Sequence, residues 1–358
     1  MYNTLVNLQT GPRILDYSLE MNAQDRTKAV FFDHLSSTSF GYGGDPNNVS
    51  LVSISKGRIY DFQGSFRRDR QYFDYDLLAN PLIPPASSPF LPTLDSPHLY
   101  NTVRRMTDLN IKLAPLSVVS AHFGYSKYVN QGPSYSTVHV GAEALLTQDW
   151  RHSTDVWNGG IDWKPLKGTS VSYDQFITHY KGNTSWKLTG TSYQLSNGTP
   201  VSLGINLSSV WKTPCATPFS SNGTVNPTCS AFLAYDRTAP TRTLFPSEQL
   251  RFQSTTVPRV TMNGRILYMG TTSHLVAFSE RFNGLDSRAR TREQVTTGSA
   301  SPRRINANAD FGITWQATST IAFSDVFNFW YFRQPATSIF TQTNYAGTSM
   351  LQPPGTAT

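Results

Sequence analysis

The ten residues from Asn306 to Trp315 read NANADFGITW, and every odd-numbered residue among them is apolar while every even-numbered one is polar or glycine. Successive side chains of a β-strand point to opposite faces, so this alternation predicts a strand with one apolar and one polar face. The same period of two recurs over residues 15–22, 60–67, 108–113, 119–126 and 201–208. We therefore predict an all-β chain with about twelve to fourteen strands.

Composition agrees with this prediction and excludes several other classes. Of the 358 residues, 15% are charged and 13% are aromatic, and 24 Gly and 22 Pro interrupt the chain too often for long helices. The sequence contains no run near the ~18 consecutive apolar residues that a membrane-spanning helix needs. The net charge is +7, but the arginines are scattered and no RNA-binding signature accompanies them, so we expect no nucleic-acid partner.

The connections between the expected strands come in two sizes. Tight turns are expected at 56–57 and 165–168, and long loops at 69–105, 129–152, 211–248 and 284–304. Structureless loops longer than ~12–15 residues are unusual in compact soluble domains, whereas short turns alternating with long external loops are typical of membrane barrels. We therefore predict one domain, residues 1–358, that forms an antiparallel up-and-down transmembrane β-barrel, incomplete or open if strands are missing.

The polar positions of these strands carry charges that predict an aqueous lumen. A cationic side chain at the bilayer midplane costs ~2–4 kcal/mol, so charged side chains belong on the inner face of such a barrel. The aromatic residues occupy the other face, as in the interfacial girdles of membrane barrels. Glu280 and Asp325 lie between phenylalanines, and we expect them near an interface. The candidates for the lumen are Asp61, Arg67, Asp108, Lys112, Asp162, Asp174, Arg265 and Asp310.

Arginines gather where the expected strands meet the expected long loops. Two interpretations stay open: a solvated rim that stops the strands sliding into the bilayer, or a basic mouth that attracts anionic solutes or lipid phosphates. The rim candidates are Arg68, Arg70, Arg104, Arg105, Arg288, Arg290, Arg292, Arg303 and Arg304.

Motifs of catalysis and metal binding do not stand out. The seven histidines lack ligand spacing, and neighbouring carboxylates such as Asp74 and Asp76 give no evidence of the separation that a glycosidase needs. We therefore expect no enzymatic activity, no metal and no cofactor. Cys215 and Cys229 are 14 positions apart, which suits a loop-closing disulfide worth ~3 kcal/mol, with two unpaired thiols as the alternative.

The two ends of the chain predict a fragment. Residues 1–6 lack the basic and apolar segments of a secretory signal, although a disulfide would favour export. Residues 352–358 read as a loop and not as a final strand. We expect a larger barrel, truncated at both ends.

Three segments carry a resemblance to a known family. Residues 60–70 (YDFQGSFRRDR), 73–81 (FDYDLLANP) and 282–288 (FNGLDSR) resemble large outer-membrane β-barrel proteins of acidobacterial type. Those proteins are similar to the MtrB/PioB family, the porin partners of decahaem cytochromes. The resemblance implies a bacterial outer-membrane location, contact with membrane lipid and a periplasmic or multihaem cytochrome partner. The Cys-x-x-Cys that these families often carry near their start has no match here.

Two functions follow as hypotheses. The first is a non-enzymatic outer-membrane barrel that acts as a passive pore or as a sheath for a partner protein. The alternative is a secreted soluble β protein that binds or hydrolyses carbohydrate, with the aromatic residues as sugar platforms. Two stacked sheets that bury the aromatic rings between them would favour the alternative.

Overall fold

The computed structural model describes residues 14–23, 31–42, 47–73, 100–114, 118–139, 143–188, 193–194, 200–201, 230–286 and 291–346. Within these ranges every regular element is a β-strand, which confirms the predicted all-β class. Among the described residues no helix has the length and apolar character needed to cross a bilayer.

The strands become longer from the N-terminus towards the C-terminal half of the chain, from nine residues in β1 to 27 in β13. Their bounds are β1 Ile14–Asn22, β2 His34–Tyr42, β3 Asn47–Lys56, β4 Tyr60–Phe73, β5 Tyr100–Leu113, β6 Val119–His139, β7 Glu143–Leu166, β8 Thr169–Leu188, β9 Tyr193–Gln194, β10 Pro200–Val201, β11 Ser230–Thr238, β12 Thr241–Ser254, β13 Val260–Asp286, β14 Thr291–Gln316, β15 Ala322–Arg333 and β16 Ala336–Ala346.

Fourteen of these strands form one antiparallel sheet, and β9 and β10 form a separate small pair. Strands β1 to β8 each pair with the next strand in sequence, which confirms the predicted meander. Farther on, β11 and β12 together fill one position between β8 and β13, and β15 and β16 together flank β14. Prolines separate these half-strands, because a proline has no N–H to give to a ladder. The carbonyls of Pro240 and Pro335 still accept bonds from Val276 and Arg303.

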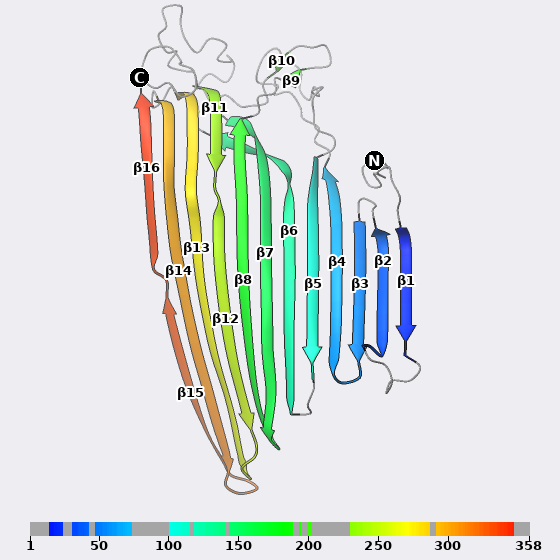
Figure 1. Cartoon of the computed structure of the whole chain (residues 1–358). Coiled ribbons are helices and arrows are strands. Elements are labelled where there is room, and N and C mark those ends of the chain that lie inside the picture. The colour runs from blue at the N-terminus through cyan, green and yellow to red at the C-terminus, as the bar shows by residue number, and fades with distance from the viewer. Residues whose placement is uncertain are drawn as a thin grey trace, which may run out of the picture.

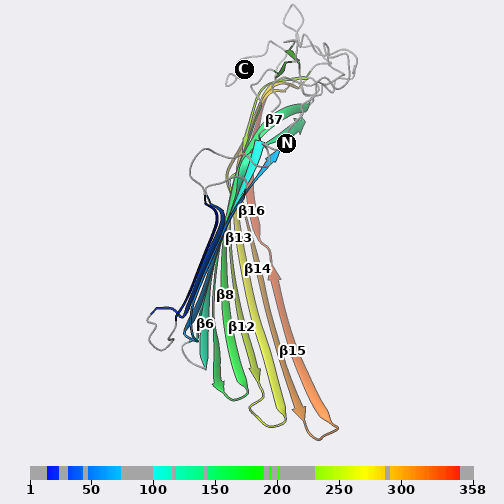
Figure 2. The same ribbon diagram turned by 90° about the vertical axis from the view of Figure 1, so that its right-hand side faces the viewer.

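The sheet is a single curved layer with two free edges, β1 on one side and β15 and β16 on the other (Figures 1 and 2). Among the described strands, pairing returns on itself only through β8, β11, β13 and β12, around the break at Pro240. The predicted closure into a barrel is therefore not established by these pairings. A second sheet stacked on the first is likewise absent from the described part of the chain.

The register sorts the side chains of the sheet into two faces. Residues directly opposite each other on paired strands share a face, and we call such a line of residues a row. One row contains Asp61, Lys112, His122, Gly160 and Asp174, on five successive strands from β4 to β8. We call this the polar face. It carries all eight charged residues that the sequence suggested for the lumen: Asp61, Arg67, Asp108, Lys112, Asp162, Asp174, Arg265 and Asp310.

Tight turns join the strands at one end of the sheet, as predicted at 56–57 and 165–168. Gly57 and Gly168 have φ of +48° and +85° in the turns after β3 and β7. Glycine adopts this left-handed conformation without the penalty that a Cβ would bring.

The structure corrects the loops predicted at 129–152 and 284–304. There β6 and β7 pair as far as His139 and Glu143, and β13 and β14 continue to Asp286 and Thr291. The apolar–polar alternation that reveals a half-buried strand fades in these extensions. The sheet thus extends far beyond its alternating part: the 27 residues of β13 span about 90 Å.

The loops predicted at 69–105 and 211–248 are also shorter than expected, because β4, β5, β11 and β12 occupy parts of them. Several predicted features lie outside the described residues. These are Cys215 and Cys229, the rim candidates Arg288 and Arg290, the side chain of Arg292, and most of the strand expected over 201–208.

Candidate functional site

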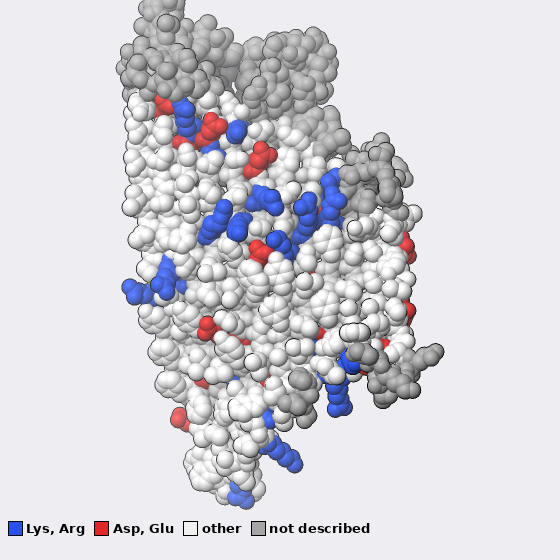
Figure 3. Space-filling model, viewed as in Figure 1, with Lys and Arg blue, Asp and Glu red and all other residues white. Residues whose placement is uncertain are grey.

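The face opposite the polar one, which we call the apolar face, carries a broad band of apolar side chains. On β14 the band runs from Ile305 to Trp315, an 11-residue stretch with every second side chain on this face. The side chains are exposed: Ile266 is 54% accessible, Trp315 51% and Phe327 59%. Figure 3 shows this face, with a wide area that has few charged side chains in the lower half of the sheet. We call this area the apolar band.

Aromatic residues are frequent in the apolar band. Tyr125 and Trp157 lie opposite each other on β6 and β7, with ring centroids 5.7 Å apart. Trp315 stacks on Phe323 at the lower end, with centroids 5.8 Å apart. Asp325 lies opposite Ile313 near the same lower end.

A line of cations crosses the apolar face immediately above the band, where above means towards the end that carries β11 and β16 in Figure 1 (Figure 3). We call it the basic belt. Each member lies on the apolar face, within six residues of an apolar residue of the band on its own strand. Its members are Arg68, Arg70, Arg105, Lys127, Arg151, Lys181, Arg242, Arg303 and Arg333.

Sequence analysis found only part of this belt. Arg68, Arg70, Arg105 and Arg303 were among the rim candidates, whereas the other members stand alone in the sequence and were missed. The sequence does contain a signal that could have located them. Each occupies the same odd-numbered or even-numbered positions as the apolar residues of its own strand, so it lies on the same face. Lys127 follows Phe123 and Tyr125 in this way.

The structure also corrects the position of the rim arginines. Six of them lie inside long strands and not at the strand ends, since β4, β5 and β14 continue past them: Arg68, Arg70, Arg104, Arg105, Arg303 and Arg304. Adjacent arginines point to opposite faces. Arg68, Arg105 and Arg303 join the basic belt, and their neighbours Arg67, Arg104 and Arg304 lie on the polar face at the same height.

The polar face carries a network of ion pairs in the same lower half of the sheet. Asp174 is 7% accessible and accepts from Arg251 Nη2 at 2.7 Å, and its Oδ1 lies 3.2 Å from His122 Nε2. Nearby, Arg265 Nη2 donates to Asp310 Oδ2 at 2.6 Å. These charges are paired across strands, and a surface of this kind suits contact with water and ions.

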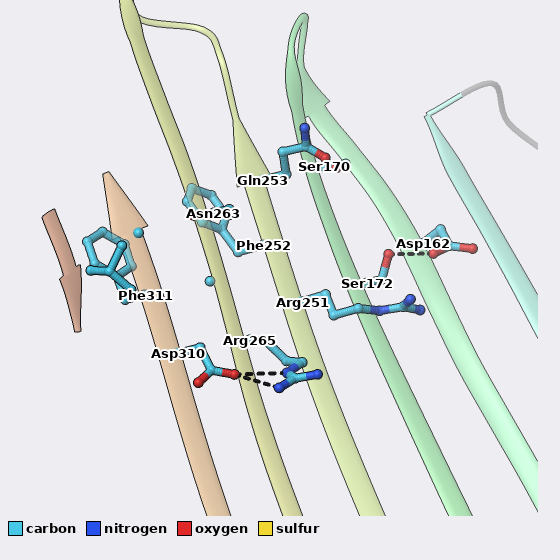
Figure 4. Close-up of a pocket in the computed structure, with 13 residues that line it drawn as sticks. Asp162, Ser170, Ser172, Arg251, Phe252, Gln253, Asn263, Arg265, Asp310 and Phe311 are labelled. Atoms are coloured by element: carbon cyan, nitrogen blue, oxygen red, sulfur yellow. Dashed lines mark hydrogen bonds and ion pairs between the residues drawn. The ribbon is translucent and has the colours of Figure 1, made fainter. Parts of the chain in front are cut away.

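A shallow groove of about 580 Å³ collects several of these groups (Figure 4). Arg251 and Arg265 lie directly opposite each other on β12 and β13, a like-charge pair that is unfavourable by itself. Carboxylates on either side offset the positive charge of the two arginines. Asp310 lies next to Arg265 on one side, and Asp162, which accepts from Ser172 at 2.6 Å, lies on the other. The groove is therefore an open, charge-balanced surface and not an enclosed pocket.

Glycines make room for these cross-strand contacts. Gly160 lies on β7 between His122 on β6 and Asp174 on β8, in the same row. A Cβ at Gly160 would come within 2.5 Å of His122 Cε1 and 2.6 Å of Asp174 Oδ1. The missing side chain is what allows His122 and Asp174 to meet across an intervening strand.

At the upper end of the sheet the polar face changes character and carries a small apolar cluster. Leu146, Tyr235 and Phe282 are buried there, and Trp186 packs against them. The Tyr235 hydroxyl donates to Glu280, and burial together with this carboxylate raises the pKa of Tyr235 well above its usual value. Trp186 therefore lies on the polar face, which corrects the expectation that the aromatic residues occupy the other face.

No group of three or more His, Cys, Asp or Glu side chains gathers as a metal site among the described residues. The arrangement is a two-faced sheet, with paired charges on one face and a band of exposed apolar side chains on the other.

Comparison with known proteins adds no relative. No protein-family model, curated protein or solved structure matches the chain. The resemblance to outer-membrane barrels stays a prediction from the sequence.

Proposed function

We propose that the chain forms the wall of a non-enzymatic β-barrel in a bacterial outer membrane, with the apolar band against lipid and the polar face towards an aqueous lumen. The observation that carries this proposal is that the same strands hold an exposed apolar band on one face and paired charges on the other. An apolar surface of this extent is rare on a soluble monomer and marks contact with a membrane or a partner.

The height of the apolar band supports a membrane. Eleven residues of β14 cover about 35 Å along the strand, or about 27 Å along the membrane normal at the ~40° tilt usual in barrels. Barrels of this class have an outer apolar band about 25 Å tall, and a spanning strand takes ~9–11 residues. The belt of cations at the upper border of the band agrees with a boundary at this height.

The proposal includes closure of the sheet. Backbone N–H and C=O groups at an open edge have no partner in hydrocarbon, and each unsatisfied group costs several kcal/mol. In the membrane the edges formed by β1 and by β15 and β16 must therefore be hydrogen-bonded, either to each other or to further strands.

Reconstitution tests the proposal. We expect the protein to partition into detergent and to conduct ions in planar bilayers as a passive pore. Lys112→Glu on the polar face should shift the ion selectivity towards cations, because charges that line a lumen set its selectivity. Lys181→Glu makes the same charge change on the apolar face and should leave the selectivity unchanged.

Other outcomes separate the alternatives. A monodisperse protein that needs no detergent would contradict the membrane proposal and favour the secreted carbohydrate-binding protein. If the barrel is a sheath, its lumen would be occupied by a partner protein, and the two proteins would copurify. The multihaem cytochrome implied by the resemblance would then appear as a haem absorbance band in the purified complex.

A further inference from the structure

The basic belt is unusual in the balance of its charges. It holds nine cations. The register places two carboxylates beside them on the same face: Asp155, which pairs with Lys127 at 3.4 Å and accepts from Tyr125 at 2.9 Å, and Asp149, which lies two residues from Arg151 on β7. On the polar face, by contrast, Arg251 pairs with Asp174 and Arg265 pairs with Asp310. Counted over the described residues, the belt therefore carries more cations than carboxylates.

The belt is also a line. It runs from β4 to β15 over nine strand positions, or about 38 Å at 4.8 Å per strand. A single small anion contacts two or three neighbouring cations, so it cannot occupy a line of this length. A row of separate anionic groups can.

The surroundings of the belt identify the kind of anion. Phe66, Tyr125 and Trp157 lie on the same face directly below it, in the exposed apolar band. In a membrane, the boundary between apolar chains and water is the level of the lipid phosphates, and arginine binds phosphate through two parallel hydrogen bonds. A nucleic acid would also meet positive charge here, but it would gain nothing from the apolar band beside it.

We propose that the basic belt binds the phosphate groups of anionic lipids in the leaflet at the upper end of the band. The inference rests on the membrane location proposed above, and it adds a lipid preference and an orientation to it. Three belt arginines are next to another arginine in the sequence, and the two members of each such pair lie on opposite faces of the sheet. This arrangement provides matched variants for the test.

The test compares two triple variants of identical composition. Arg68→Gln/Arg105→Gln/Arg303→Gln removes three charges from the belt, and Arg67→Gln/Arg104→Gln/Arg304→Gln removes three from the polar face at the same height. Each protein is reconstituted in phosphatidylcholine vesicles, and spin-labelled phosphatidic acid and phosphatidylcholine report which lipid lies at the protein surface. A cation near an anionic surface is worth ~1 kcal/mol, so we expect the wild type to prefer phosphatidic acid about fivefold or more.

The belt variant should lose most of this preference, and the polar-face variant should keep it. The same loss in both variants, or no preference in the inserted wild type, would overturn the inference while leaving the membrane location intact. Failure of the wild type to insert would refute the membrane location, and the inference with it.

A second measurement needs no variant. For the wild type alone, rising salt should weaken the preference for phosphatidic acid, because salt screens charges at the membrane surface. A preference that does not respond to salt would contradict binding by the belt. Salt-sensitive retention of a DNA duplex in place of lipid selectivity would assign the belt to nucleic acid and overturn the proposal.

Discussion

Arginine in place of Ile266 is expected to lower the free energy of unfolding of the membrane-inserted protein by about 2–4 kcal/mol. Ile266 lies on β13 near the centre of the apolar band, with 54% of its surface exposed. A charged group there would lie in hydrocarbon, and the side chain could reach water only by distorting the lipid around it. The measurement is reversible unfolding by guanidinium from lipid vesicles.

The neighbouring residue supplies the control. Leu267 is of similar size, but it lies on the polar face, opposite Gln249 and Asn308. Leu267→Arg should change the free energy of unfolding by less than about 0.5 kcal/mol, because the new charge would meet water. Equal costs at 266 and 267 would show that the two faces do not meet different solvents.

Alanine in place of Gly160 is expected to cost about 1–3 kcal/mol and to break the contact between His122 and Asp174. Besides these two side chains, the new Cβ would come within 2.6 Å of the backbone oxygen of Tyr173, so rotation of a side chain alone cannot relieve the clash. The free energy of unfolding reports the cost. The histidine ring signals in a magnetic resonance spectrum report the lost contact.

Gly159 is the matched control. A Cβ there would meet Phe123 Cδ2 at 3.6 Å and the His122 oxygen at 3.7 Å, which are ordinary contacts. Gly159→Ala should therefore be neutral, or stabilise the strand by up to about 1 kcal/mol through lost glycine entropy. If Gly160→Ala is as well tolerated as Gly159→Ala, the row does not pack as described.

Much of the lower half of the sheet could be predicted from the sequence, because alternation is a local signal. Residues such as Asp61 and Asp310 could be assigned to one face from their own strands, since strand parity is independent of the partner strand. The register then places them together across the sheet. The order of the strands followed from the meander, in which each strand pairs with the next one along the chain.

The upper half could not be predicted in the same way. Around Ser134 and Ser299 the strands carry polar residues on both faces, so the apolar–polar alternation disappears although the pairing continues. Five members of the basic belt were missed for a different reason. Lys181 and Arg242 are 61 positions apart in sequence, and only the register of β8 on β12 brings them together. Whether a strand lies at an open edge is likewise a property of the whole sheet, so it cannot be predicted from the sequence of that strand alone.

The most direct test is whether lipid meets the apolar face. Single cysteines are placed one by one from Ile305 to Trp315 on β14, in a background with Cys215 and Cys229 changed to serine, and each carries a nitroxide label in lipid vesicles. Access of oxygen, which dissolves in lipid, should be high at the odd positions, and access of a water-soluble nickel complex high at the even ones. Odd positions that neither reagent reaches would mean that protein covers the band, and they would contradict the membrane wall.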